Sequence, residues 1–349
     1  MHTILYRRKG RVDTRPLIYL LVRGSMAKIF DLHCDTIWRM EQARAKRERI
    51  SLRKSNLQVD EEKLIAGEYF AQCFAVFTPN KFKNPYEKCL RAIDLYHEEL
   101  KKCPSLAPVY EYKDFQKNAD NDKVSAILTM EDGCPIGNDF ERLERLYRLG
   151  VRMVCLTHNL QNQIGYPNLL EGESNRVPNT EKGLTEFGKA LVKKMNELGI
   201  IVDLSHLSDK GFYDALACSE KPVVLSHSNA RSLCSHVRNA SDDMLKKLAD
   251  NGGVIGINCV KAFLNDDADR GAQTLSRMLE HILYIKNKIG VEHIAIGTDF
   301  DGADTDIELS NAEKMPLLIY EMARAGLTAD EIDGITYKNA LRVFKENLK

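Results

Sequence analysis

A histidine and an aspartate stand two positions apart near the start of this chain, directly after a short apolar segment. They are His33 and Asp35, in the stretch Asp31-Leu-His-Cys-Asp-Thr36. Side chains two positions apart in an extended strand point the same way, so both can reach one metal ion. Imidazole nitrogen and carboxylate oxygen together suit zinc. Alone the pair is a weak signal, because H-x-D more often marks a turn at a strand end.

Three further residues extend this pair to a centre for two ions. His206 and His227 end consecutive apolar segments, so they would be neighbours in a parallel sheet and could hold a second ion. Glu131 falls between these groups in strand order, and its two oxygens could bridge both ions. Taken singly, each histidine could be a core residue or a helix cap, and Glu131 could begin a turn. Their joint placement favours two metal ions that share a hydroxide and polarise a carbonyl.

Eight apolar segments of strand length must position these residues, and several are apolar throughout, as is typical of parallel strands buried on both faces. Amphipathic segments that favour helices lie between them, one ending before Gly199 and another beginning at Ser241. This alternation predicts a (β/α)8 TIM barrel of the metal-dependent hydrolase type, with two or three more helices in 310–349. The predicted strands are 28–33, 69–77, 124–130, 151–157, 200–205, 222–226, 253–258 and 293–298, and the predicted helices are 85–101, 139–149, 184–198, 241–249 and 274–289.

The barrel prediction can be checked within the sequence, because the active sites of such barrels lie at the C-terminal ends of the strands. Six of the eight predicted strands end on a histidine or a carboxylate, and four of the nine histidines stand there. Chance placement would scatter them. The six ends are His33-Cys-Asp35, Glu131-Asp-Gly133, Thr157-His-Asn159, Ser205-His206, Ser226-His-Ser228 and Thr298-Asp299.

The composition is that of a soluble globular protein, with 44% hydrophobic and 29% charged residues. Fifty basic residues balance 50 acidic ones, so no global basic field is available for nucleic acid or anionic lipid. The nine cysteines include no C-x-x-C pair, which argues against a zinc ribbon and a disulfide framework and favours reduced thiols in the cytoplasm.

Residues 1–25 differ from the rest of the chain. Five basic residues precede the apolar run 17–22, which is too short for a signal-peptide core or a membrane span. We expect 1–25 to be a disordered tail or a start-site artefact, with Met26 as the functional start, and 26–349 to form a single barrel domain with extra C-terminal helices. We expect no membrane attachment.

The ordered motifs resemble those of the membrane (renal-type) dipeptidases, a family of zinc metallopeptidases, and look closest to its bacterial branch. The motifs are H-x-D, E-D-G, L-T-H-N, D-L-S-H, S-H-S-N-A-R and G-T-D-F-D-G, and the match runs from about Ile29 to the C-terminal helices. The resemblance implies a (β/α)8 barrel with two zinc ions. One zinc would take His33 and Asp35, the other His206 and His227, with Glu131 bridging them.

The resemblance also implies three substrate contacts. His158 matches the histidine that contacts the substrate carbonyl and stabilises the oxyanion, and Arg238 matches the arginine that receives the terminal carboxylate. Asp299 matches the acidic residue that holds the free amine and passes a proton to the leaving amine. Asp301 competes with Asp299, which we prefer because it stands at the strand end, whereas Asp301-Gly302 is typical of a turn.

These residues predict a zinc dipeptidase that attacks the peptide bond with a metal-bridging hydroxide, with dipeptides ending in a D-residue among the candidate substrates. The family suggests a homodimer. One alternative is another binuclear barrel amidohydrolase acting on a cyclic amide or ester, although such enzymes commonly begin with H-x-H. A metal-free binding protein with the same barrel is a second. The polar loop 161–179 and Asn258-Cys-Val260, where animal members have a tyrosine after the asparagine, depart from the family and leave the side-chain pocket open.

Overall fold

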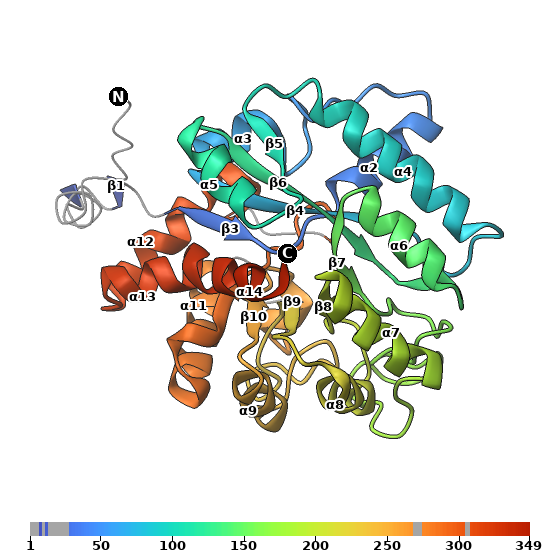
Figure 1. Ribbon diagram of the computed structural model, residues 1–349. Helices are drawn as coiled ribbons and strands as arrows, with labels where there is room; N and C mark the ends of the chain where they lie inside the picture. The colour runs from blue at the N-terminus through green and yellow to red at the C-terminus, as the bar shows by residue number, and fades with distance from the viewer. Residues whose placement is uncertain (1–6, 9–10, 13–27, 268–273, 304–307) are drawn as a thin grey trace.

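Eight parallel strands close into a barrel in the computed structural model, which describes residues 7–8, 11–12, 28–267, 274–303 and 308–349 (Figure 1). Around the barrel each strand pairs with the next, and β11 pairs with β3. The strands are β3 (Ile29–Asp31), β4 (Tyr69–Phe77), β6 (Val124–Glu131), β7 (Val151–Cys155), β8 (Ile201–Asp203), β9 (Val224–Ser228), β10 (Val254–Ile257) and β11 (Ile294–Ile296). The predicted barrel and all eight predicted strands are therefore confirmed.

One strand beside the barrel was not predicted. β5 (Leu106–Pro108) pairs in parallel with β6 outside the closed ring. It has three residues and ends on proline, so it gives neither an alternating pattern nor a long apolar run.

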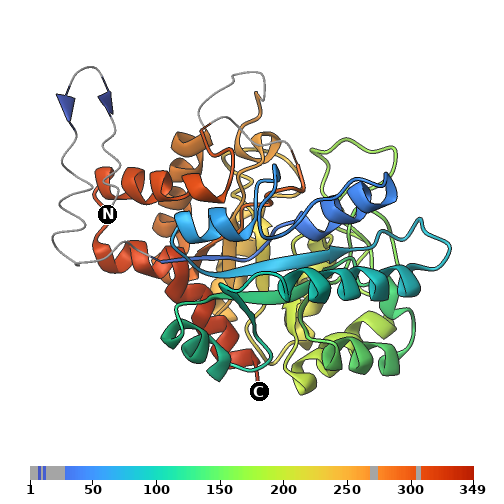
Figure 2. The ribbon, with the colours of Figure 1, turned by 90° about the horizontal axis from the view of Figure 1, so that it is seen from above.

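Helices surround the barrel on all sides (Figures 1 and 2). The five predicted helices are present, and their ends differ from the predicted ones by at most two residues. Thr185 caps the helix that ends before Gly199. Ser241 caps the helix Asp242–Asp250 by accepting the backbone N–H of Met244. The α-helices are α2 (Thr36–Ala45), α3 (Glu61–Ala66), α4 (Pro85–Leu100), α5 (Lys113–Asp120), α6 (Phe140–Arg148), α7 (Glu186–Leu198), α8 (Asp209–Cys218), α9 (Asp242–Asp250), α10 (Lys261–Leu264), α11 (Thr274–Ile289), α12 (Pro316–Arg324), α13 (Ala329–Asp333) and α14 (Asn339–Asn347).

The last helix closes the end of the barrel at which the strands begin. Phe344 of α14 joins the apolar cluster inside the barrel, with its ring centroid 4.9 Å from that of Phe30. The amide Nδ2 of Asn347 donates to the carbonyl of Pro222 just before β9, and that of Asn339 donates to Ile294 at the start of β11. Because this end is sealed, the chemistry is confined to the opposite end, where the strands finish.

Two glycines let the ends of the three consecutive strands β9, β10 and β11 approach closely near that end. A Cβ on Gly297 would lie 1.7 Å from the carbonyl oxygen of Ser226, and a Cβ on Gly256 would lie 2.1 Å from the same atom. No side chain fits at such distances from a backbone atom. Close packing around Ser226 therefore fixes the strand that carries His227.

Most of residues 1–25 lie outside the described part of the chain. Within it, β1 (Arg7–Arg8) and β2 (Arg11–Val12) pair antiparallel as a separate sheet. The expected tail, and the division at Met26, stay predictions. Among the described helices, none has the length and apolarity needed to cross a bilayer.

Candidate metal centre

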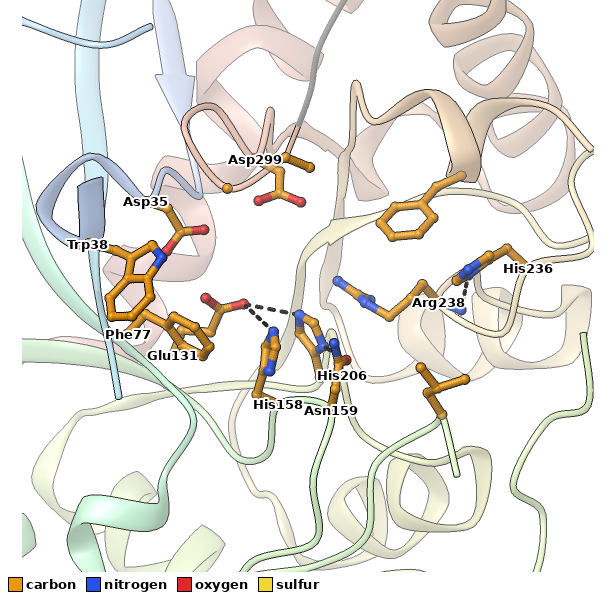
Figure 3. A pocket seen from close by; sticks show the side chains of 14 residues that line it. Asp35, Trp38, Phe77, Glu131, His158, Asn159, His206, His236, Arg238 and Asp299 are labelled. Atoms are coloured by element: carbon orange, nitrogen blue, oxygen red, sulfur yellow. Dashed lines mark hydrogen bonds and ion pairs between the residues drawn. The ribbon is translucent and has the colours of Figure 1, made fainter. Parts of the chain in front are cut away.

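The carboxylate of Glu131, at the end of β6, lies at the centre of the predicted site and faces two groups of donors (Figure 3). Its Oε1 lies 3.0 Å from Nε2 of His206 and 3.6 Å from Nε2 of His227. Its Oε2 lies 3.8 Å from Nε2 of His33. One carboxylate therefore reaches toward both predicted metal positions.

The first position lies at the end of β3. Nε2 of His33 is 3.5 Å from Oδ2 of Asp35 and 3.9 Å from Oδ1 of Asp299. All three side chains are buried. Gly302 leaves room for them, because a Cβ there would lie 2.4 Å from Oδ2 of Asp35.

The second position lies at the ends of β8 and β9. Nε2 of His206 is 3.1 Å from Nε2 of His227, as expected for neighbouring strands. The Nδ1 of His206 is 3.0 Å from the amide oxygen of Asn159. His158 completes this side, with its ring centroid 4.3 Å from that of His206 and its Nε2 4.0 Å from Oε1 of Glu131.

Three overlapping groups of these side chains could each hold a metal ion. Each offers ligand atoms that lie within 4.8 Å of one another. The clusters are His33 with Glu131 and His227, Glu131 with His158 and His206, and His33 with Asp35 and Asp299. Their overlap at His33 and Glu131 is what two adjacent cation positions would produce.

Two observations show that the residues fit a divalent cation. Within the described chain, Nε2 of His33 and Oδ1 of Asp35 are buried without a hydrogen-bond partner, which is costly for polar atoms. The donors are nitrogen and oxygen atoms only. The nearby thiols of Cys155 and Cys259 donate to the backbone oxygens of Thr157 and Thr298 instead. All nine cysteines are free, which agrees with the expectation of no disulfide framework.

The pKa shifts of these side chains show that burial disfavours their charged forms. Burial raises the pKa of Glu131 well above its usual value and lowers the pKa of His206 and of His227 well below theirs. Burial would also lower the pKa of His33, but the carboxylates of Glu131, Asp35 and Asp299 raise it to about 10. Positive charge placed among these carboxylates is therefore favoured, and bound cations would supply it.

Two aspartates below the site hold the strand ends in place. Asp31 accepts the backbone N–H of Thr298 at 2.9 Å and its hydroxyl at 2.7 Å, and thereby joins the ends of β3 and β11. Asp203 likewise joins the ends of β8 and β9, because it accepts hydrogen bonds from the hydroxyl of Ser205 and from the backbone N–H and hydroxyl of Ser226. Neither aspartate was predicted to have a role, although each stands at a strand end two or three positions before a predicted ligand.

A cavity of about 390 Å³ opens above these donors. Arg238 lies in its wall, buried, with its guanidinium against the carbonyls of Ser205 and His227 and 5.4 Å from the ring centre of Phe263. In Figure 3, Arg238 and His236 lie on one side, and Asp35, Trp38 and Asp299 on the other. A molecule in the cavity would therefore meet a cation at one end and carboxylates at the other.

Asp299 and Asp301 have different surroundings in the structure. Asp299 lines the cavity, and its Oδ2 accepts a hydrogen bond from Nδ2 of Asn258 at 3.2 Å. The carboxylate of Asp301 instead accepts the hydroxyl of Thr36 at 2.7 Å and the backbone N–H of Gln58 at 2.8 Å. The preference for Asp299 as the cavity residue therefore agrees with the geometry, and Asp301 ties α2 to the segment before α3.

Five large side chains that line the cavity, outside the six motifs, received no role from the sequence. Four are aromatic or apolar, so a search for polar strand ends does not find them, and they come from α2, β4, the loop after β7, the loop after β9 and α10. They are Trp38, Phe77, Leu169, His236 and Phe263. Position along the chain could have identified two of them. Phe77 ends β4, and Trp38 follows Asp35 by three residues, which is about one helical turn.

The loop that carries Arg238 is held from below by His281 of α11. Its Nδ1 accepts the backbone N–H of Ala230 at 3.1 Å, so its Nε2–H is left to donate to the carbonyl of Leu264 at 3.2 Å. Only a neutral imidazole can make both bonds. Burial accordingly lowers the pKa of His281 to about 4.

The chain is similar to proteins described as dipeptidases and metallopeptidases. A family model described as Membrane dipeptidase (Peptidase family M19) matches residues 24–349. Dipeptidase AclJ of Aspergillus oryzae is 34% identical over 299 residues, which cover 82% of this chain and 69% of that protein. A Rhodobacter sphaeroides metallopeptidase, solved with a phosphinate mimic of L-Ala-D-Ala, superimposes with a TM-score of 0.86 at 23% identity, covering 93% of this chain and 100% of that one. The metallopeptidase called dipeptidase AC has a TM-score of 0.86 at 25% identity and covers 93% and 99%.

We predict that His281 makes stability depend on pH. Its pKa falls from 6.5 in the unfolded chain to about 4 in the folded one, so the unfolded state binds more protons between these values. Its contribution is therefore present above pH 6.5 and is lost as pH falls toward 4, by up to about 3 kcal/mol. Urea unfolding of the wild type and of His281→Asn across pH 4–7 measures it as the difference between the two slopes. Equal slopes would contradict the assignment.

Proposed function

The chain belongs to the membrane dipeptidase family and is a metallo-dipeptidase, and from this premise we propose that it hydrolyses dipeptides with two zinc ions per chain. The resemblance seen in the six motifs is thereby confirmed. The observation that carries the two-ion proposal is the position of Glu131, whose two oxygens face separate sets of donors. The homodimer and the cytoplasmic location expected from the sequence stay predictions.

We assign the ligands as the sequence suggested. His33 and Asp35 would hold one zinc, His206 and His227 the other, and Glu131 would bridge them. Nitrogen and oxygen donors without thiolate, beside an open cavity, are typical of catalytic rather than structural zinc. Zinc bound there lowers the pKa of a coordinated water and polarises a carbonyl oxygen.

His158 would stabilise the negative charge that develops on the substrate carbonyl oxygen. Its ring packs against Phe77, with centroids 4.5 Å apart, and lies in the cavity wall beside Glu131. Burial, with the charge of Arg238, lowers its pKa to about 3. The imidazole is therefore neutral near pH 7. It can donate one N–H to the substrate carbonyl oxygen and has no positive charge that would bind it to the neighbouring carboxylates instead.

Asp299 would hold the free amine of the substrate and pass a proton to the leaving nitrogen. The hydrogen bond from Asn258 orients its carboxylate and leaves Oδ1 toward His33. Burial raises the pKa of Asp299 to about 6, closer to the pH at which a group can both accept and return a proton.

Arg238 would receive the C-terminal carboxylate. Its bonds to two backbone carbonyls fix the guanidinium plane, and a guanidinium has five N–H donors, so others remain for a bidentate contact. With the amine held at Asp299 and the carboxylate at Arg238, the reacting bond must be the only peptide bond between the two charges. This double clamp would explain a restriction to dipeptides.

We further propose that a D-residue is accepted at the C-terminal position. The ligand named for the Rhodobacter structure, a mimic of L-Ala-D-Ala, prompts the idea. The cavity wall includes Leu169, His236 and Phe263, and the last two lie beside Arg238. The leucine and the phenylalanine bear no polar group that would favour one configuration by a hydrogen bond, so selection there would rest on shape.

Metal content tests the ligand assignment. We expect about two zinc ions per wild-type chain and about one in His33→Ala and in His206→Ala, because each variant removes a donor from a different position. Elemental analysis after dialysis measures this. His97→Ala is the control, since His97 lies in α4 and contacts the carbonyl of Leu149. Two ions retained in His206→Ala would contradict the assignment.

A peptide panel tests the activity. We expect the zinc enzyme to cleave L-Ala-L-Ala and L-Ala-D-Ala, and to cleave L-Ala-L-Ala-L-Ala at least about 100-fold less efficiently, because a longer peptide cannot place both termini in the clamp. Chelation should abolish cleavage and added zinc should restore it. Release of free alanine is the measurement. Equal cleavage of the tripeptide would reject the clamp, and resistance of L-Ala-D-Ala alone would reject only the D-residue proposal.

Replacing Arg238 tests the carboxylate contact directly. Arg238→Ala should lower kcat/KM for L-Ala-L-Ala by about 30- to 1,000-fold, corresponding to about 2–4 kcal/mol for a lost buried charge contact. The amide L-Ala-L-Ala-NH₂ lacks the carboxylate, so the variant should lose little further activity on it. Metal content is measured in parallel. An equal loss on both substrates would mean that Arg238 acts only by holding the strand ends.

A further inference from the structure

The hydroxyl of Ser226 lies between a carboxylate and the imidazole of His227, below the cavity. Its Oγ is 2.5 Å from Oδ2 of Asp203 and 2.7 Å from Nδ1 of His227. The three side chains are at most 1% exposed. Water therefore does not compete for these bonds, and the direction of each follows from which atoms carry protons.

The other bonds of Asp203 fix that direction. Oδ1 already accepts the backbone N–H groups of Ser205 and Ser226 and the hydroxyl of Ser205. Oδ2 is left for the hydroxyl of Ser226. Because an ionised carboxylate only accepts, the proton of Ser226 points to Asp203, and its oxygen can only accept from Nδ1–H of His227.

We propose that Asp203 is a positioning residue that sets the tautomer of His227 through Ser226. A neutral imidazole carries one ring proton, and with that proton on Nδ1 the lone pair of Nε2 faces Oε1 of Glu131 and Nε2 of His206. Nε2 is then ready to bind a cation before one arrives. The inference rests on the proposed ligand role of His227, and it adds the group that prepares this ligand.

Asp31 provides the contrast within the same barrel. It is equally buried and accepts a hydroxyl at a similar distance, from Thr298. Thr298, however, contacts the backbone of His33 and of Phe300 and not an imidazole ring. Asp31 thus holds backbone, whereas Asp203 holds backbone and also orders the proton on a side chain.

The variant Asp203→Asn should reverse the relay without changing its shape. The Oδ1 position must remain an acceptor for two N–H groups, so the new NH₂ group falls at the Oδ2 position and donates to Ser226. The serine hydroxyl must then turn toward Nδ1 of His227, and the ring proton moves to Nε2. The same exchange in the serine protease triad gives the wrong histidine tautomer.

The test is nitrogen NMR of histidine-labelled, metal-free, full-length protein, which reports which ring nitrogen carries the proton. The wild type should show His227 protonated at Nδ1, and Asp203→Asn should show it protonated at Nε2. Zinc titration of the same samples should show one of the two ions bound about 10- to 100-fold more weakly in the variant, and the other unchanged.

Ser205→Ala is the matched control, because it removes a hydroxyl that contacts the same carboxylate, Ser226 and the backbone N–H of His227, but leaves the bond between Ser226 and the ring of His227. It should keep the Nδ1–H tautomer, and Ser226→Ala, which removes the link, should lose the preference. Thermal unfolding checks that each variant is folded. A wild-type His227 protonated at Nε2, or an unchanged tautomer in both Asp203→Asn and Ser226→Ala, would overturn the relay. A correct tautomer whose signals do not respond to zinc would overturn the ligand role instead.

Discussion

The structure depends on one unfavourable placement, a buried glutamate at the point where the strand ends of the barrel converge. Glu131 is 4% exposed and lies within 4.0 Å of nitrogen atoms from four histidines. An ionised carboxylate buried without compensating charge costs several kcal/mol, so the ionised form of Glu131 needs added positive charge nearby. Protonation of His33 provides part of this positive charge, and metal ions would provide more. The need for a cation is therefore built into the position of one side chain.

The rest of the barrel can be understood as support for that placement. Apolar residues fill the end where the strands begin, and Phe344 closes it, so burial of apolar surface stabilises the fold away from the charged end. Between the two ends lies a polar layer in which Asp31 and Asp203 join neighbouring strands through hydroxyl and backbone donors. Because these bonds join the ends of neighbouring strands, they set the distances between ligands that belong to different strands.

Much of this could be predicted from sequence because the signals were local or periodic. His33 and Asp35 share a face by strand geometry, and His206 and His227 were placed together once their segments were recognised as consecutive strands. The role of Asp203 could not be found that way, since it depends on a register that brings Ser226 within 2.5 Å of it. Trp38 and Phe77 were missed for a different reason. Aromatic residues at element ends are usually core, and only the closed barrel shows that these two face the cavity.

The polar loop 161–179 also acts on the end of the cavity that holds Arg238. The backbone oxygen of Asn175, in the long loop after β7, accepts the N–H of Val237 at 2.8 Å, directly before Arg238. Its neighbour Arg176 forms an ion pair with Asp266 at 2.9 Å, which links this loop to the segment after α10. The ion pair is half exposed and contributes little to stability by itself. Its position matters more, because both partners lie in loops that supply Leu169 and adjoin Phe263. Changes in this loop would therefore alter the pocket that we propose for the C-terminal residue, while the proposed metal donors, held by strand ends, stay in place.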